Sequence, residues 1–115
     1  MKNKASELSE EEFLASYDAS RYPKPSVTVD TVIFRKIAEQ MQVLLIKRGN
    51  HPYRGFWALP GGFLNMDENL AIAAAREVHE ETALKLTALE EIGVYGEVGR
   101  DKRDRVITVD RKSVV

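Results

Sequence analysis

The sequence contains no cysteine, which excludes disulfide bonds, thiolate zinc sites and cysteine nucleophiles. It has no apolar run near the roughly 20 residues that a membrane span requires, and its N-terminus lacks the apolar stretch of a signal peptide. Its 17 basic and 18 acidic side chains give a net charge of −1, so no overall positive field indicates nucleic-acid binding. A chain without cysteine is compatible with a reducing compartment. These absences predict a small cytoplasmic protein with no membrane or nucleic-acid partner.

The chain is long enough for one domain with its own hydrophobic core. Its 115 residues are 43% hydrophobic and 30% charged, which is ordinary for a globular protein, and they contain no internal repeat. A domain of this size buries roughly two thirds of the surface that its unfolded chain exposes, so it needs no disulfide bond or structural metal to fold.

Two segments are expected, an N-terminal helical segment at residues 1–20 and a main domain at residues 21–115. Ser9 followed by Glu12 forms a capping-box pattern, and Pro23 stops any helix that begins there. The later elements predicted are strands at 27–34, 42–47 and 56–59, a helix at 69–82, and strands within 86–98 and from 106 onward. This order predicts an α/β (α+β) protein with helices packed on a mixed sheet.

Three glutamates gather on one side of the predicted helix. With Glu77 at zero on a helical wheel, Glu81 lies about 40 degrees to one side and Glu80 about 60 degrees to the other. Like charges at these spacings destabilise a helix, by about 3 kcal/mol for a poorly solvated pair at about 5 Å and an effective dielectric of about 20. A divalent cation reverses the sign, because Mg²⁺ and Mn²⁺ prefer hard oxygen ligands. The alternative is a solvated acidic face that Arg76 screens.

The spacing of residues around this cluster carries more information than the cluster itself. Gly62, five residues, Glu68, seven residues and then the run REVHEETAL from Arg76 resemble the Nudix box, whose pattern ends in REUXEEXGU with U a bulky aliphatic residue. Every specified position matches except one, since Ala83 stands in the place of glycine. Similarity to the ADP-ribose pyrophosphatase branch of that family extends over roughly residues 20–109, in the segments YPKPSVTVDTVIF, LLIKR, FWALPGGF and RDKRDRVITV.

The resemblance implies an α/β/α sandwich that acts as a metal-dependent hydrolase. The residues that match the family's metal site, for Mg²⁺ or Mn²⁺, are Gly62, Glu77, Glu80 and Glu81. By the same resemblance, Arg76 would orient the glutamates and Glu68 would lie close to the metal. The implied reaction is attack of a metal-activated water on a diphosphate phosphorus. The implied substrate is ADP-ribose or a related nucleoside diphosphate derivative.

Several other side chains are weaker candidates. Lys47, Arg48 and Arg54 would meet phosphate or ribose oxygens, although basic loop residues are more often simply solvated. Trp57 would stack on an adenine, but a lone tryptophan beside a strand is more often part of the core, which is the interpretation we favour. The candidates for an additional carboxylate from a distal loop are Glu97, Asp101 and Asp104.

The sequence departs from the family pattern in two ways. Ala83 would end the helix in the left-handed conformation that glycine favours, at a cost of roughly 1 kcal/mol. Nudix domains also continue beyond this point with a further strand and helix, so the domain is expected to be incomplete at its C-terminus. The run Asp110-Arg111-Lys112 is expected to interrupt the last strand. Exposed core surface would favour association, and we expect a homodimer.

Three functional classes remain open. The first is an active hydrolase of ADP-ribose or a similar compound. The second is a ligand-sensing Nudix-like domain of a transcriptional regulator, which binds a nucleotide or sugar without cleaving it, because the segment YPKPSVTVD also resembles such regulators. The third is an inert domain with an acidic helix. The intact glutamates favour the hydrolase, and the motif match makes the inert domain the weakest interpretation.

Overall fold

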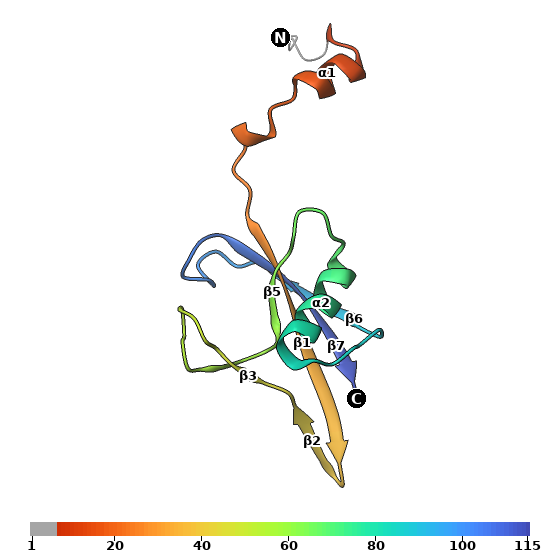
Figure 1. The fold of residues 1–115 in the computed structure, drawn as a ribbon. Coiled ribbons are helices and arrows are strands. Elements are labelled where there is room, and N and C mark those ends of the chain that lie inside the picture. The colour runs from red at the N-terminus through yellow and green to blue at the C-terminus, as the bar shows by residue number, and fades with distance from the viewer. Residues whose placement is uncertain (1–6) are drawn as a thin grey trace.

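The computed structural model describes residues 7–115, which form a mixed sheet with one helix packed against it and an extended N-terminal arm (Figure 1). In chain order the elements are α1 (Glu10–Ser16), the 3-10 helix η2 (Ala19–Arg21), β1 (Ser26–Ile37), β2 (Gln40–Val43), β3 (Ile46–Lys47), β4 (Trp57–Ala58), β5 (Gly61–Phe63), α2 (Leu70–Thr82), β6 (Glu90–Tyr95) and β7 (Val106–Val114). No helix in the described range is both long enough and apolar enough to cross a membrane.

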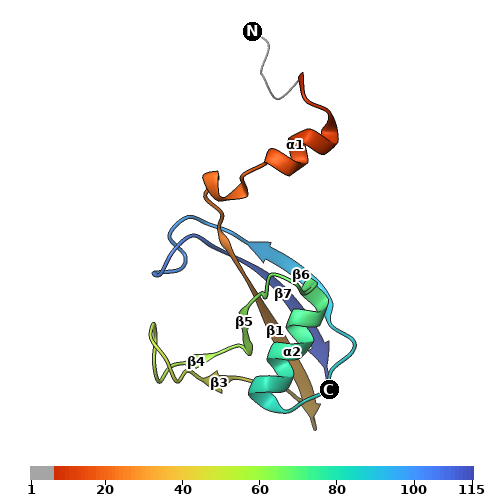
Figure 2. The same cartoon turned by 45° about the horizontal axis from the view of Figure 1, so that its top comes forward.

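The two longest strands, β1 and β7, run parallel and side by side in the main sheet (Figure 2). Their nine paired positions extend from Ser26 opposite Val106 to Phe34 opposite Val114. The strand order is β2-β1-β7-β6, with β5 also paired to β1, and the pairings of β2, β5 and β6 are all antiparallel. Strands β3 and β4 form a separate antiparallel ribbon. The predicted mixed sheet is therefore confirmed.

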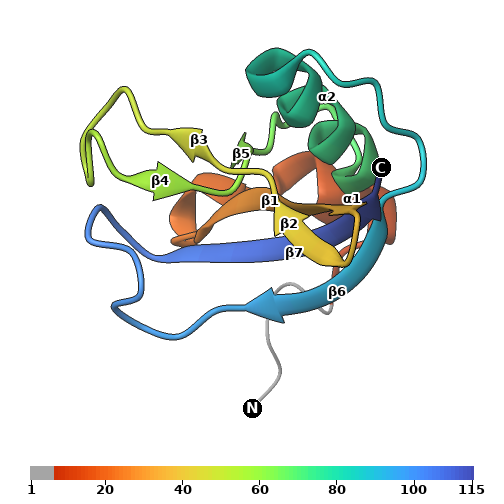
Figure 3. The ribbon, with the colours of Figure 1, turned by 90° about the horizontal axis from the view of Figure 1, so that it is seen from below.

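Helix α2 buries one side against the sheet and leaves the other side to solvent (Figure 3). Ala73 and Ala74 pack on Val29 at the centre of the core, because small side chains let the helix approach the sheet closely. The partly buried residues around this contact are Leu64, Leu70 and Leu89. The helix follows Asn69, whose backbone is extended, and it ends at Ala83 with a left-handed φ of 64°. The predicted helix and its left-handed end are both confirmed.

Strand β5 brings the glycine pair of the motif onto β1. Gly61 pairs with Asp30, and Gly62 pairs with Val29. A Cβ on Gly61 would lie 2.0 Å from Oδ1 of Asp30 and 2.2 Å from the carbonyl oxygen of Val29, so only glycine permits this approach. The sequence analysis ended the preceding strand at residue 59 and predicted no strand at the glycine pair, so β5 was missed. The physical reason is that glycine usually marks a turn, whereas here it marks close backbone contact.

Two other strand predictions need correction. The second predicted strand is split into β2 and β3. The expectation that Asp110, Arg111 and Lys112 interrupt the last strand is wrong, since β7 continues through them. Opposite charges on the neighbouring strand β6 accommodate this run, with Arg111 3.7 Å from Glu91 and Lys112 3.7 Å from Glu90.

The N-terminal arm extends away from the sheet, and the molecule measures 67 × 29 × 23 Å (Figures 1 and 2). The predicted capping box is confirmed: the Glu12 N–H donates to Ser9 Oγ at 3.1 Å, and the Ser9 N–H donates to Glu12 Oε1 at 3.4 Å. Every residue of α1 is exposed, so this helix adds no second helical layer to the sheet. Residues 1–6 of the predicted helical segment lie outside the described residues.

Candidate functional site

Arg76 ties the carboxylates of α2 to the loop that precedes the helix. Its Nε and Nη2 donate to the two carboxylate oxygens of Glu68 at 2.9 and 2.5 Å. Its Nη1 donates to Glu77 at 2.8 Å and to Glu80 at 3.2 Å. The Arg76 guanidinium lowers the pKa of Glu68, and the Glu68 carboxylate raises the pKa of Arg76, so both groups stay charged. The arginine therefore holds three carboxylates from two chain segments together.

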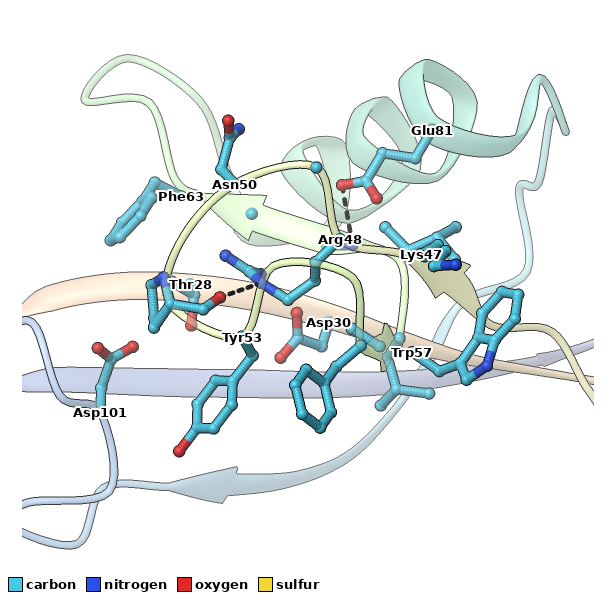
Figure 4. A pocket seen from close by; sticks show the side chains of 18 of the residues that line it. Thr28, Asp30, Lys47, Arg48, Asn50, Tyr53, Trp57, Phe63, Glu81 and Asp101 are labelled. Carbon is cyan, nitrogen blue, oxygen red and sulfur yellow. Dashed lines mark hydrogen bonds between the residues drawn. The ribbon is translucent and has the colours of Figure 1, made fainter.

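Glu81 lies at one end of a cleft, beside the glycine pair (Figure 4). Its Oε1 accepts a hydrogen bond from the Gly61 N–H at 3.4 Å, whereas its Oε2 is buried without a partner among the described residues. Burial raises the pKa of Glu81, and the negative charges of Glu77 and Asp30 raise it further. A Cβ on Gly62 would lie 2.7 Å from the Glu77 carboxyl group. The Glu77 carboxylate thus occupies the space that glycine leaves.

These residues suit a divalent cation by their chemistry. The buried oxygen of Glu81 is a hard ligand without a counter-charge among the described residues, and the neighbouring Glu77 carboxylate, which is paired with Arg76, supplies further hard oxygens. Within residues 7–115, however, no group of three carboxylate, imidazole or thiolate side chains is arranged to hold a metal ion. Arg76 is paired with both Glu77 and Glu80. A cation and Arg76 would therefore compete for the same carboxylates.

The cleft has a volume of about 850 Å³ and is bounded by the β3–β4 ribbon, β5 and the loop before β7. This volume is within the range of roughly 300 to 1,000 Å³ that is usual for small-ligand sites. Its basic lining residues are Lys47, Arg48, Arg100, Lys102 and Arg103, and its aromatic ones are Tyr53, Phe56, Trp57 and Phe63. Flat apolar rings and cations suit a ligand that has an aromatic base and an anionic group.

The three predicted substrate-binding residues, Arg48, Arg54 and Trp57, differ in their positions relative to the cleft. Arg48 points into the cleft, and its Nε donates to the Pro52 carbonyl at 2.7 Å, so it also braces its own loop (Figure 4). Trp57 lines the cleft and is 66% exposed, with Lys47 Nζ 5.9 Å from the ring centroid. The interpretation of Trp57 as a core residue is therefore wrong, because the two-residue strand β4 lies off the main sheet. Arg54 is exposed and does not line the cleft.

Asp30 is a cleft residue that the sequence interpretation missed. Burial, together with the neighbouring charge of Asp110, raises the pKa of Asp30 to about 6. Its Oδ2 lies 3.3 Å from the Thr108 hydroxyl, which also donates to Asp110 Oδ1 at 2.8 Å. The signal in the sequence was a lone acidic residue inside a strand of β-branched residues.

The three distal carboxylates have different surroundings. Asp101 lines the cleft, whereas Glu97 and Asp104 are exposed and do not. Arg103 donates to Asp101 from Nε at 3.0 Å and from Nη2 at 2.7 Å, and this guanidinium lowers the pKa of Asp101 to about 2. A carboxylate held in this way orders its arginine and is a poor proton acceptor near neutral pH.

Comparison with known proteins places this geometry in a family. Over 103 residues the chain is 44% identical to the ADPR responsive transcriptional repressor NtrR of Acinetobacter baylyi, an alignment that covers 88% of this chain and 41% of that protein. It is 41% identical over 88 residues to an ADP-ribose pyrophosphatase of Methanocaldococcus jannaschii, covering 76% of this chain and 50% of that one. The chain thus spans half or less of the length of both relatives.

Solved structures and the family model agree with these relatives. The NUDIX domain of Shewanella oneidensis NrtR, complexed with ADP ribose, superposes with a TM-score of 0.88 at 36% identity, covering 94% of this chain and 71% of that one. A MutT/nudix family protein from Enterococcus faecalis superposes with a TM-score of 0.86, also at 36% identity, covering 100% of this chain and 50% of that one. The NUDIX domain model matches residues 24–114. The chain therefore belongs to the NUDIX domain family.

Proposed function

We propose that this domain binds ADP-ribose or a related nucleoside diphosphate derivative in the cleft and hydrolyses its diphosphate linkage with a metal-activated water. The observation that carries the proposal is the carboxylate of Glu81, which ends the cleft with a buried and unpartnered oxygen beside Glu77. The relatives whose names refer to ADP-ribose support the choice of ligand.

The side chains around the cleft support recognition of a base and of phosphates. The Trp57 indole is exposed, so its face is accessible to an aromatic base. Arg48 points into the cleft with its Nε fixed by the Pro52 carbonyl, which leaves the outer guanidinium nitrogens for an anionic group. We assign these two residues to substrate binding. Nothing in the cleft supports that role for Arg54.

The metal site proposed for Mg²⁺ or Mn²⁺ consists of the side chains of Glu77, Glu80 and Glu81 and the backbone carbonyl of Gly62. A divalent cation bound there supplies acidification of a water molecule and stabilisation of charge on the phosphate oxygens. Arg76 fixes the direction of Glu77 and Glu80 through charge-assisted hydrogen bonds, and Glu68 in turn fixes Arg76. The Glu81 carboxylate brings a negative charge to the end of the cleft where the diphosphate would lie.

Incubation of the 115-residue chain with ADP-ribose and Mg²⁺, with release of AMP as the readout, tests this proposal. We expect AMP release that depends on Mg²⁺ and that is lost in Glu80→Gln, a substitution that keeps the size of an exposed side chain and removes its charge. Turnover that is unchanged in this variant would contradict the assignment of Glu80.

A second candidate function is recognition of ADP-ribose without hydrolysis. It is favoured by the 44% identity to an ADPR responsive repressor and by Arg76, which already neutralises two of the three carboxylates that a catalytic metal would need. A rise in melting temperature with ADP-ribose, together with no AMP release at any Mg²⁺ or Mn²⁺ concentration, would decide for this function.

A further inference from the structure

The loop between β6 and β7 holds one arginine in a fixed position at the cleft. Asp101 accepts three hydrogen bonds from Arg103: from its backbone N–H at 2.9 Å, from Nε at 3.0 Å and from Nη2 at 2.7 Å. The guanidinium carbon also lies 4.7 Å from the centroid of the Phe63 ring. The side chain is thus held along one edge by a carboxylate and across one face by an aromatic ring.

The remaining edge of this guanidinium is available to a ligand. Among the described residues, Nη1 of Arg103 donates to no protein atom, and the side chain is 40% exposed. Asp101, by contrast, is 12% exposed and has its carboxylate directed at Arg103. Much of the ordering of Arg103 has therefore taken place before any ligand binds, which favours recognition of a rigid anionic group.

The position of Arg103 relative to the carboxylates decides which part of a ligand it meets. Phe63 follows Gly62 directly in β5, so their Cα atoms lie about 3.8 Å apart. Gly62 contacts the Glu77 carboxylate, and Arg103 lies over Phe63. Successive residues of a strand point to opposite faces, so Gly62 and Phe63 face different sides of β5. Arg103 nevertheless lines the same cleft as Asp30 and Glu81, and the Asp30 charge acts on both of them, so one ligand in the cleft can meet both Arg103 and the proposed metal site.

The neighbouring basic residue has a different contact. Lys102 Nζ lies 4.4 Å from the centroid of the Tyr53 ring, on the loop between β3 and β4. This contact joins the two loops that face each other across the cleft, and both contribute lining residues. Lys102 therefore links the loops, while Arg103 is the residue of the pair that presents an oriented donor.

We propose that Arg103 recognises the diphosphate group of the ligand, with Asp101 and Phe63 as its positioning residues. The inference rests on the proposed function only in taking the ligand to be a nucleoside diphosphate compound. A guanidinium suits this role because it can donate to two phosphate oxygens at once. Nη1 of Arg103, which does not donate to Asp101, is still available as a donor toward the cleft.

Calorimetric titration with ADP and with adenosine tests the role of Arg103, because the two probes differ only in the diphosphate. Arg103→Gln is expected to weaken ADP binding by about tenfold or more and to leave adenosine binding within about twofold of the wild type. Lys36→Gln removes the same charge from the exposed tip of β1 and should change neither affinity. Equal ADP affinities in Arg103→Gln and the wild type, or no ADP binding by the wild type, would overturn the inference.

Asp101→Asn and Arg103→Lys test whether orientation matters beyond charge. Both keep the positive charge at position 103, and both should lower the ratio of ADP affinity to adenosine affinity while the melting temperature changes little. Stronger ADP binding by Asp101→Asn would mean that the carboxylate only neutralises Arg103, and would overturn the positioning role. If the wild type binds ADP but neither binds nor cleaves ADP-ribose, the proposed function fails. The ADP and adenosine affinities of the wild type and Arg103→Gln would still test the role of Arg103.

Discussion

Gly62 is the residue at which the backbone fold and the proposed metal site meet. A methyl group there would lie 2.7 Å from the carboxyl carbon and from both oxygens of Glu77, so Gly62→Ala must displace that carboxylate. We expect Mg²⁺-dependent AMP release to fall by about tenfold or more, because a small displacement of a catalytic group has a large effect on rate. Gly49→Ala is the matched control, since a Cβ at that cleft residue meets no atom within 4 Å. Full turnover by Gly62→Ala would remove Glu77 from the proposed metal site.

Asp30 makes folding stability depend on pH. Burial raises its pKa from 3.8 to about 6, so the folded state binds the proton more tightly than the unfolded chain does. Its contribution to stability is therefore fully present below about pH 4 and is lost as the pH rises through about 6. Between pH 4 and pH 7, we expect the free energy of unfolding to fall less in Asp30→Asn than in the wild type. The difference between the two falls should be at most about 3 kcal/mol.

Urea denaturation in the presence of a chelator measures this difference without interference from bound cations. Asp67→Asn makes the same chemical change at an exposed position and controls for the loss of one negative charge. Parallel stability curves for Asp30→Asn and the wild type across this range would show that burial does not perturb Asp30 as described.

Helix α2 has a C-terminal residue that is suboptimal for its conformation. Ala83 adopts φ 64°, and its N–H donates to the His79 carbonyl at 2.9 Å. Ala83→Gly removes the steric cost of a Cβ in the left-handed region, and we expect stabilisation by about 1 kcal/mol. Ala71→Gly places the same substitution in the exposed first turn of the helix and should destabilise, by less than the cost of glycine in a helix interior. Thermal melts of the two variants should move in opposite directions. A lower melting temperature for Ala83→Gly would contradict the helix end described here.

The α2 part of the site could be predicted because helical spacing alone fixes its geometry. Residues at i, i+3 and i, i+4 share a side of a helix, so Glu80 had to be a neighbour of both Arg76 and Glu77 once the helix was recognised. The contact between Arg76 and Glu68, which spans eight residues from the helix to the loop before it, was not predicted. The pairing of Arg76 with Glu77 and Glu80 agrees with the expectation that Arg76 contacts the acidic side of the helix.

The other wall of the cleft could not be predicted, because it depends on long-range strand pairing. Asp30, Phe63 and Arg103 come from three distant segments, which the pairings of β1 with β5 and of β1 with β7 bring together. Local patterns carry no information on such pairings. Trp57 illustrates the same limit: its type favoured the core, and only the position of the β3–β4 ribbon off the main sheet exposes it.

At the scale of the whole molecule, the N-terminal arm has apolar side chains that the rest of the chain does not cover. Phe13 and Leu14 of α1 and Tyr17, the residue that follows the helix, occupy an arc of about 100 degrees on a helical wheel. They are 37%, 61% and 50% exposed, and the arm extends away from the sheet (Figure 1). Exposed apolar surface of this kind is costly unless it is buried by association. We therefore expect a homodimer in which the arm contributes to the interface.

Light scattering at micromolar concentration checks this expectation, and a dimer would have about twice the chain mass of 13.0 kDa. Leu14→Glu places a charge within the apolar arc and should shift the equilibrium toward the monomer, because an interface disfavours an unpaired buried charge. Ala15→Glu adds the same charge about 150 degrees from the centre of that arc and should leave the mass unchanged. A monomeric wild type would refute the dimer. A dimer that Leu14→Glu leaves intact would place the interface outside the apolar arc of the arm.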